Sequence, residues 1–404
     1  MNKENMKITV CNMVNSSIRT EAVISHINNH PDYKFIYVSP HKSERGLIVT
    51  GCKDRNFQTP ENSGDGKLSN LHELLENQDN IVCTDQLLKY FNDQTLEIIK
   101  GKNYKLILDE GYSVIEPVRI HKDDFNLLLR SNIISNEDGI IKWLDKEYVG
   151  KFRHFKQIAN RGHLYFEDGC LFWKLPIETL MAFKDVIILA CMFDYQIQRY
   201  YFELNNIDIR NISIEELSGT TILHERSEYL KEAVGKIHIL DNEKINSVGY
   251  GKHALSSNWF KREFDKKGKP NIIQLQNNIS NVFRYHFKAK SDTCMWTTFK
   301  QSIEKLSSSG YTKGFVPYNS RDTIKYRNKS HLAYCKNVFL DSFTKNYFIK
   351  YQINMDEDKY ALSQIVPWIF QSPICDGQDV WIYIPSSRMR NLLTNWIMSN
   401  IQNK

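Results

Sequence analysis

The amino-acid sequence predicts an α/β fold with two lobes, each a mostly parallel sheet flanked by helices. Three observations support this prediction. Short apolar runs recur along the chain, helical segments separate many of them, and 404 residues exceed the usual length of one domain. In the first half, the runs that we interpret as strands are Lys7–Val10, Lys34–Val38, Asn80–Cys83, Tyr104–Leu108 and Asp185–Ala190.

Helical segments lie between these strands. The stretch Thr20–Asn29 places Val23 and Ile27 one turn apart, and Leu71–Asn77 and Thr84–Phe91 are further helical segments. Parallel strands need long crossover connections, which helices usually supply. We therefore expect the first-half strands to join one mostly parallel sheet.

A polar segment from residue 205 to about 221 predicts the domain boundary, which gives lobes of residues 1–205 and 206–404. The second lobe ends in an amphipathic helix, because Met389, Leu392, Leu393, Trp396 and Ile397 recur with helical spacing. Its predicted strands are Lys236–Leu240, Asp292–Thr297, Lys336–Leu340 and Asp379–Pro385.

Composition excludes several classes of protein. The chain lacks an apolar run of 18 residues and a signal-peptide core, so we expect a cytoplasmic protein without a membrane span. Its eight cysteines form no C-x-x-C pair and its twelve histidines no H-E-x-x-H motif, which disfavours a zinc site. G-x-S-x-G and G-x-G-x-x-G motifs are also missing. The net charge of +6 is compatible with nucleic acid as a partner.

The sharpest local signal is the apolar strand Lys105–Leu108 followed by Asp109 and Glu110. In nucleoside triphosphatases, such a strand directs its Asp at Mg²⁺, and the adjacent Glu can polarise the attacking water. This Walker B pattern requires a phosphate-binding loop upstream, between a strand and a helix.

The segment Cys11–Thr20 occupies the place of that loop. A working loop would end in G-x-G-K-T, but Ser16 and Ile18 stand where glycines are expected. Arg19 replaces the lysine, and only Thr20 matches. Glycines allow backbone N–H groups to approach phosphates, and arginine does not reproduce the point charge of lysine.

These motifs resemble those of the superfamily 2 (DEAD/DEAH-type) helicases, in particular short helicase-like proteins of phages and mobile elements. The resemblance implies two RecA-like lobes. It also implies catalytic roles for Asp109, Glu110 and Gln364, with Mg²⁺ on Asp109 if nucleotide binds. The residues that the resemblance places against nucleotide are Ser16, Ser17, Arg19 and Thr20. ATP and Mg²⁺ are thus the cofactors that the family would use.

The same resemblance predicts contacts to single-stranded or duplex nucleic acid. His41 follows the second strand, Thr84 follows the third, and Asn319 lies in a motif-like segment of the second lobe. Basic residues after that motif extend the predicted interface, namely Arg321, Lys325 and Arg327. A second basic segment, Trp259–Lys269, interleaves aromatic rings with cations.

The chain departs from the family pattern at two electrostatic elements. The phosphate loop is altered, and Gln371 stands where an arginine would contact the γ-phosphate. Such an arginine contributes about 10³–10⁵ in rate in related enzymes. Three hypotheses remain open: a nucleic-acid-binding protein with weak or lost ATP hydrolysis, an active helicase or translocase with a divergent loop, and a non-catalytic protein that engages a host factor.

Overall fold

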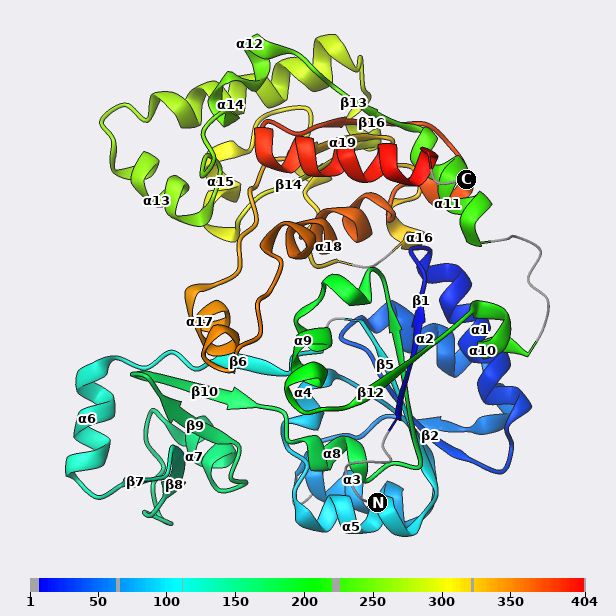
Figure 1. Ribbon diagram of the computed structural model, residues 1–404, viewed down its shortest axis with the longest axis vertical. Coiled ribbons are helices and arrows are strands. Elements are labelled where there is room, and N and C mark those ends of the chain that lie inside the picture. The colour runs from blue at the N-terminus through cyan, green and yellow to red at the C-terminus, as the bar shows by residue number, and fades with distance from the viewer. Residues whose placement is uncertain (1–6, 63–65, 111, 220–225, 321–322, 403–404) are drawn as a thin grey trace. The chain divides into compact units, whose positions relative to one another are not determined.

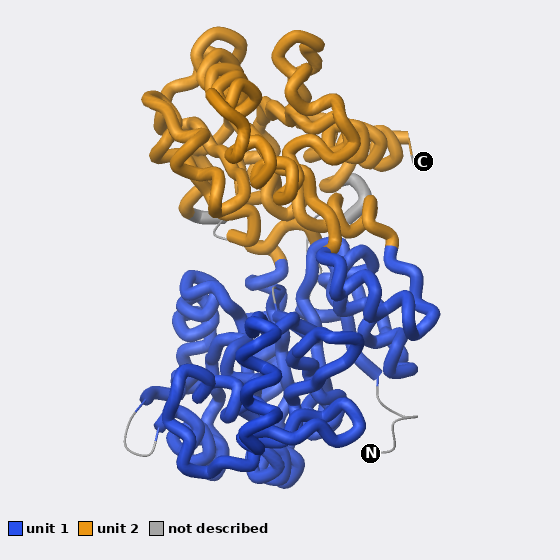
Figure 2. Tube along the Cα trace, turned by 90° about the vertical axis from the view of Figure 1, so that its left-hand side faces the viewer, with its two compact units in different colours: residues 1–12, 19–220, 341–355 blue, residues 13–18, 221–340, 356–404 orange. Residues whose placement is uncertain are grey.

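The computed structural model describes residues 7–62, 66–110, 112–219, 226–320 and 323–402. The chain divides into two compact units, coloured separately in Figure 2. Unit 1 comprises residues 1–12, 19–220 and 341–355, and unit 2 comprises residues 13–18, 221–340 and 356–404. Each unit has its own hydrophobic core.

Unit 1 is built on a seven-stranded sheet in the order β12-β1-β11-β5-β2-β4-β3, with every neighbouring pair parallel. Figure 1 shows its strands among the surrounding helices. The five predicted first-half strands all belong to this sheet, so that prediction is confirmed. The strands are β1 (Lys7–Asn12), β2 (Lys34–Val38), β3 (Phe57–Gln58), β4 (Asn80–Cys83), β5 (Tyr104–Asp109), β11 (Asp185–Ala190) and β12 (Asp208–Ile212).

The central strands of this sheet are buried along almost their whole length, as expected for a sheet covered on both faces. Strand β12 pairs with β1, so the residues just after position 205 continue the first sheet. The helices of unit 1 outside its inserted subdomain are α1 (Ser16–Asn29, whose first three residues belong to unit 2), α2 (Lys42–Gly51), α3 (Lys67–Glu76), α4 (Asp85–Leu88), α5 (Asp93–Gly101), α8 (Ile177–Met181), α9 (Ile197–Leu204), α10 (Ile214–Ser218) and α17 (Ser342–Lys350).

Helix α1 begins at Ser16, so the prediction that the loop continues to Thr20 is wrong. The Oδ1 atom of Asn15 accepts hydrogen bonds from the backbone N–H of Ser17 at 3.0 Å and of Ile18 at 3.4 Å. This cap satisfies backbone donors of the first turn, which allows the helix to start before Arg19.

An antiparallel subdomain, which was not expected from the sequence, is inserted between β5 and β11. Its five strands follow the order β6-β10-β9-β8-β7, and Phe125, Leu128, Trp143 and Phe155 belong to its separate core. The elements are β6 (Ile115–Pro117), α6 (Lys122–Arg130), β7 (Ile134–Glu137), β8 (Ile140–Trp143), α7 (Arg153–Ala159), β9 (Leu164–Glu167) and β10 (Cys170–Lys174).

Unit 2 contains a four-stranded parallel sheet in the order β13-β16-β15-β14. Its strands are β13 (Ile237–Ile239), β14 (Cys294–Thr297), β15 (His331–Tyr334) and β16 (Val380–Tyr383). Its helices are α11 (Arg226–Gly235), α12 (Glu243–Asn246), α13 (Ser257–Asp265), α14 (Pro270–Asn281), α15 (Ile303–Leu306), α16 (Thr323–Tyr326), α18 (Glu357–Ile369) and α19 (Ser387–Gln402). The predicted fold class, with mostly parallel sheets flanked by helices, is confirmed.

The predicted strand Lys336–Leu340 is wrong, because the strand lies upstream at β15. Beyond β15 the backbone leaves the sheet. The N–H of Asn337 donates to the carbonyl of Leu255, and its side-chain amide donates to the carbonyls of Lys252 and Ala254. Residues 332–335 and 338–340 are both apolar, with Lys336 and Asn337 between them, so composition alone did not distinguish the strand from the extended segment after it.

Candidate functional site

The carboxyl edge of the unit 1 sheet brings several predicted site residues together. Register pairs Val38 with both Cys83 and Leu108, and Asp109 pairs with Leu189. Parallel strands end at one edge, so His41 after β2, Thr84 after β4 and the Asp109–Glu110 pair of β5 lie along it. His41 and Thr84 are both partly buried.

Arg19 and Glu110 form a buried ion pair at this edge. Arg19 Nη1 lies 2.6 Å from Glu110 Oε1, and the two residues are 2% and 5% exposed. Burial alone would lower the pKa of Arg19, but Glu110 and Asp109 outweigh burial and raise it above its usual value. The guanidinium therefore stays charged and neutralises the carboxylate beside it.

Glu110 also has an uncommon backbone conformation, with a φ of 27°. Positive φ in a residue other than glycine costs roughly 1–3 kcal/mol and persists only where the surrounding structure holds it. The backbone N–H of Glu110 donates to the carbonyl of Leu189 at 3.1 Å, and Arg19 holds its side chain. The protein itself thus fixes both ends of this residue.

Asp109 is held by Tyr37, whose hydroxyl donates to Oδ2 at 2.7 Å. Burial raises the pKa of Asp109 to about 6, with a further increase from Glu110, while Arg19 and hydrogen bonds from Tyr37 and Ser39 oppose that rise. Because Tyr37 is fully buried, this bond occupies the carboxylate from the interior of the protein.

A third buried carboxylate, Glu44 of α2, completes the cluster. Its Oε2 atom accepts a hydrogen bond from the hydroxyl of Thr20 at 2.8 Å. Burial, followed by repulsion from Asp109, raises the pKa of Glu44 to about 7. We call Arg19, Thr20, Tyr37, Glu44, Asp109 and Glu110 the unit 1 charge cluster. It contains three carboxyl groups and one cation, so it favours bound protons near neutral pH.

Within unit 2, the predicted interface residues differ in their surroundings. Asn319 and Lys325 are exposed, and Lys325 Nζ lies 5.6 Å from the ring centroid of Tyr326. Arg327 pairs with Asp376 Oδ1 at 3.1 Å and donates to the Ser17 hydroxyl at 3.1 Å. Ser16 is buried in the first turn of α1. Arg321 lies outside the described residues.

The structure also shows where Gln364 and Gln371 lie, the two glutamines named by the family resemblance. Gln364, partly buried in α18, donates to the hydroxyl of Ser363 at 3.2 Å. Gln371 is 1% exposed, and neither amide atom has a hydrogen-bond partner in the described chain. Neither residue contributes a positive charge, unlike the arginine that the family pattern places there.

The structure explains why aromatic residues occur in the basic segment Trp259–Lys269. Trp259 and Phe260 belong to the core of unit 2, so they are not exposed for stacking on bases. Lys261, Arg262 and Lys266 remain exposed on and after α13. The cations of this segment thus remain at the surface, whereas these two rings stabilise the fold.

Sequence reasoning did not identify Tyr37, Glu44 or the capping residue Asn15. Tyr37 reads as one residue of an apolar strand, and Glu44 as an acidic residue in the first turn of a helix. Only the register of β2 beside β5 and the packing of α2 bring them to Asp109 and Thr20. No short-range sequence signal identifies such partners.

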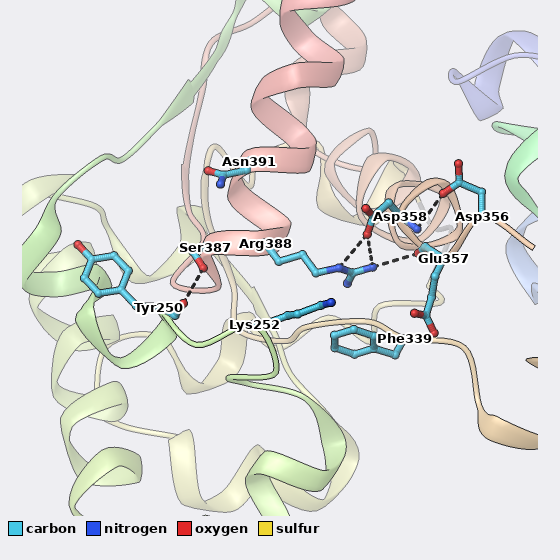
Figure 3. A pocket seen from close by; sticks show the side chains of 9 residues that line it. All are labelled: Tyr250, Lys252, Phe339, Asp356, Glu357, Asp358, Ser387, Arg388 and Asn391. Atoms are coloured by element: carbon cyan, nitrogen blue, oxygen red, sulfur yellow. Dashed lines mark hydrogen bonds and ion pairs between the residues drawn. The ribbon is translucent and has the colours of Figure 1, made fainter.

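Unit 2 has a shallow cavity of about 540 Å³ that none of the predicted site residues lines. Arg388 crosses it, pairs with Asp358 Oδ1 at 2.7 Å and donates to the carbonyl of Glu357 (Figure 3). Its guanidinium also donates to the carbonyl of Val338 at 2.7 Å. The cation is therefore satisfied by the protein. The lining residues are Tyr250, Lys252, Phe339, Asp356, Glu357, Asp358, Ser387, Arg388 and Asn391.

Charge is unevenly divided between the units. Unit 2 contains 25 of the 53 Lys and Arg residues and 15 of the 47 Asp and Glu residues, an excess of ten positive charges. Unit 1 contains the other 28 basic and 32 acidic residues, an excess of four negative charges. A mild net charge thus conceals a strongly basic unit 2.

The described part of the chain has neither a membrane-spanning helix nor a clustered metal site. None of the helices in the described ranges is long and apolar enough to cross a membrane. No group of three or more His, Cys, Asp or Glu side chains there has the arrangement of a metal site.

Comparison with known sequences gives consistent matches. The family model described as the YonV C-terminal Rossmann-like domain matches residues 231–397, and the YonV middle domain matches residues 115–173, the inserted subdomain. The SPbeta prophage-derived uncharacterized protein YonV of Bacillus subtilis (strain 168) is 36% identical over 411 residues. The match covers 97% of this chain and 98% of the relative.

Solved structures with a similar fold are XPD-type helicases. An apo XPD structure matches with a TM-score of 0.50 and 10% identity, over 100% of this chain and 97% of the other. Xpd4 of S. tokodaii matches with a TM-score of 0.51 and 12% identity, over 98% and 94%. At this identity the similarity establishes a two-lobe helicase fold and no activity.

Proposed function

The chain belongs to the YonV family, and on that premise we propose that it is a nucleic-acid-binding protein with a helicase fold whose nucleotide site no longer accepts ATP. The buried Arg19–Glu110 pair is the observation that carries this proposal. A phosphate ligand must offer its charge to the nucleotide, whereas Arg19 offers its charge to an internal carboxylate. The relative from a prophage supports a role in phage or mobile-element DNA metabolism.

The chain's own residues do not fit a triphosphate. Backbone N–H groups of Ser17 and Ile18 donate to Asn15, although a phosphate loop directs such groups at its ligand. Asp109, which would hold Mg²⁺, accepts a hydrogen bond from Tyr37, and Thr20 donates to Glu44. Each polar group that the family would use for Mg-ATP therefore has an alternative partner within the protein.

Nucleic acid is the partner that the charge distribution favours. Unit 2 has ten more basic than acidic residues, and cations that neutralise phosphates supply most of the affinity of non-specific binding. Lys325 is exposed, and the half-exposed pair of Arg327 with Asp376 is worth less than about 1 kcal/mol, so phosphate can compete for it. The helicase fold agrees with this assignment.

The first test measures nucleotide binding and hydrolysis. We expect ATP hydrolysis at background with and without single-stranded DNA, and no binding of a fluorescent ATP analogue in the presence of Mg²⁺. Asp109→Ala should leave these results unchanged. Brisk DNA-stimulated hydrolysis that Asp109→Ala abolishes would instead support the active-helicase hypothesis, with Arg19 as a working phosphate ligand.

The second test measures binding of labelled single-stranded DNA by fluorescence anisotropy at several salt concentrations. For Lys325→Gln/Arg327→Gln we expect about tenfold weaker binding at low salt and a salt slope reduced by about 1.4, because each phosphate contact on a single strand contributes about 0.7. Lys53→Gln/Lys100→Gln changes two exposed lysines of unit 1 and should leave the slope unchanged. Absence of DNA and RNA binding would favour a protein that engages a host factor.

A further inference from the structure

Lys336 is a buried lysine that the site described above does not use. It lies two residues after the end of β15 and is 2% exposed. Its Nζ atom lies 3.1 Å from the ring centroid of Tyr318 and 4.5 Å from that of Phe299. Within the described residues, Nζ forms no ion pair or hydrogen bond, and it lies against these two aromatic rings.

This environment is unfavourable for a cation without an anion. Burial lowers the pKa of Lys336 to about 7, and no charged group contributes to that shift. Of the two rings that face Nζ, only the Tyr318 phenol can titrate, because Phe299 has no ionisable group. Aromatic rings attract an ammonium group, but they do not replace the hydrogen bonds that water or a phosphate would supply.

Lys336 lies at the carboxyl edge of the unit 2 sheet, where the residues around it are closer to solvent than Lys336 itself. Strands β14 and β15 are parallel neighbours, so Phe299 after β14 and Lys336 after β15 lie at the same edge. Tyr318 and Phe299 are only partly buried, and Asn319, which follows Tyr318, is exposed. The two rings therefore separate the ammonium group from solvent, and a ligand would approach from their side.

We propose that Lys336, Tyr318 and Phe299 form a subsite for one nucleotide of a single-stranded nucleic acid. The backbone phosphate binds the ammonium group, and a base stacks on the Tyr318 or Phe299 ring. Lysine next to a stacking aromatic is the combination that binds single strands without sequence preference. This inference rests on the proposed nucleic-acid-binding function. It adds Lys336 as a binding residue, which neither the sequence motifs nor the comparisons identify, whereas Tyr318 stands next to the predicted interface residue Asn319.

The test uses the full chain and a fluorescein-labelled thymidine oligonucleotide, with anisotropy measured between pH 6 and 8.5. A bound phosphate favours the charged lysine, so affinity is greatest below pH 7 and falls by up to tenfold per pH unit above it. Lys336→Met preserves chain length and apolar packing. We expect it to bind about tenfold more weakly at pH 6.5, with a salt slope reduced by about 0.7 and without this pH dependence.

Two further variants keep the inference testable if Lys336→Met does not fold. Lys336→Arg keeps the charge at every pH, so binding should be retained above pH 7. Tyr318→Leu removes a stacking ring at a partly buried position and should weaken binding about fivefold to fiftyfold without changing the salt slope. Excess Mg-ATP should not displace the oligonucleotide, whereas displacement would identify the subsite as a nucleotide site and overturn the inference.

The outcomes distinguish this inference from the proposed function. If the unmodified protein does not bind the oligonucleotide at any salt concentration, the proposed function fails as well. If it binds, and folded Lys336→Met binds with the same affinity, salt slope and pH profile, only the subsite is wrong. In that case Lys336 is a structural lysine, and its replacement by methionine should raise the melting temperature.

Discussion

Replacing Arg19 with leucine is expected to lower the free energy of unfolding by about 3–5 kcal/mol, because it leaves Glu110 as a buried carboxylate without its cation. Three carboxyl groups would then share the cluster, and repulsion would add to the cost of burial. Urea denaturation at pH 8 measures this change as a lower midpoint with an unchanged slope.

Two controls separate the buried pair from a general effect of losing an arginine. Arg199→Leu removes an arginine whose pair with Glu203 at 3.0 Å is half-exposed, and it should change stability by less than about 0.5 kcal/mol. Arg19→Leu/Glu110→Leu removes both charges and should be more stable than Arg19→Leu alone. If Arg19→Leu is neutral, or if the double variant is less stable than Arg19→Leu, the pair does not stabilise the cluster.

The parallel sheet of unit 1 could be predicted because its strands are short, apolar and separated by helices. Burial on both faces makes strands such as Lys34–Val38 and Asp185–Ala190 continuous apolar runs, which are visible in the sequence. The order of the strands in the sheet could not be predicted from the sequence. In the structure, β11 lies between β1 and β5, although the antiparallel insertion separates β11 from β5 in the chain.

The sequence of the antiparallel insertion contains a pattern that predicts its hairpins. Asp138–Gly139 and Asp168–Gly169 stand between short runs of strand-forming residues, and all four have positive φ. Asp-Gly pairs favour the tight turns of antiparallel hairpins. These turns connect β7 to β8 and β9 to β10, so the hairpins could have been predicted, whereas their packing into one sheet could not.

The candidate site was predictable only where its residues follow a motif spacing. Asp109, Glu110, Arg19 and Thr20 occupy places that the helicase pattern defines, and the structure brings Arg19 to Glu110. Glu44 and Lys336 have no such spacing, because their environments depend on which elements pack around them. A lysine after a strand usually lies at the surface, but the Tyr318 and Phe299 rings cover Lys336.

Glu44→Gln is expected to stabilise the protein at pH 8 by about 2 kcal/mol and to have little effect at pH 5. The pKa of Glu44 is about 7 in the folded chain, above its value of about 4.3 in the unfolded chain. A carboxyl group with a raised folded-state pKa contributes stability below the unfolded pKa, and that contribution is lost as the pH rises through about 7. At pH 8 the wild-type protein must therefore bury a charge that glutamine does not carry.

Glutamine preserves the contact that matters for packing, since its Oε1 atom can accept the hydrogen bond from Thr20 as Glu44 does at 2.8 Å. The measurement is the free energy of unfolding from urea denaturation at pH 5, 6, 7 and 8. For the wild type it should decline between pH 5 and 8 more steeply than for Glu44→Gln. Glu97→Gln, at an exposed glutamate of α5, should follow the wild-type profile within about 0.5 kcal/mol. Loss of stability at pH 8 in Glu44→Gln, with an unaltered profile, would contradict this prediction. It would mean that folded Glu44 is already ionised at pH 5, and that Arg19 neutralises more of the cluster than Glu110 alone.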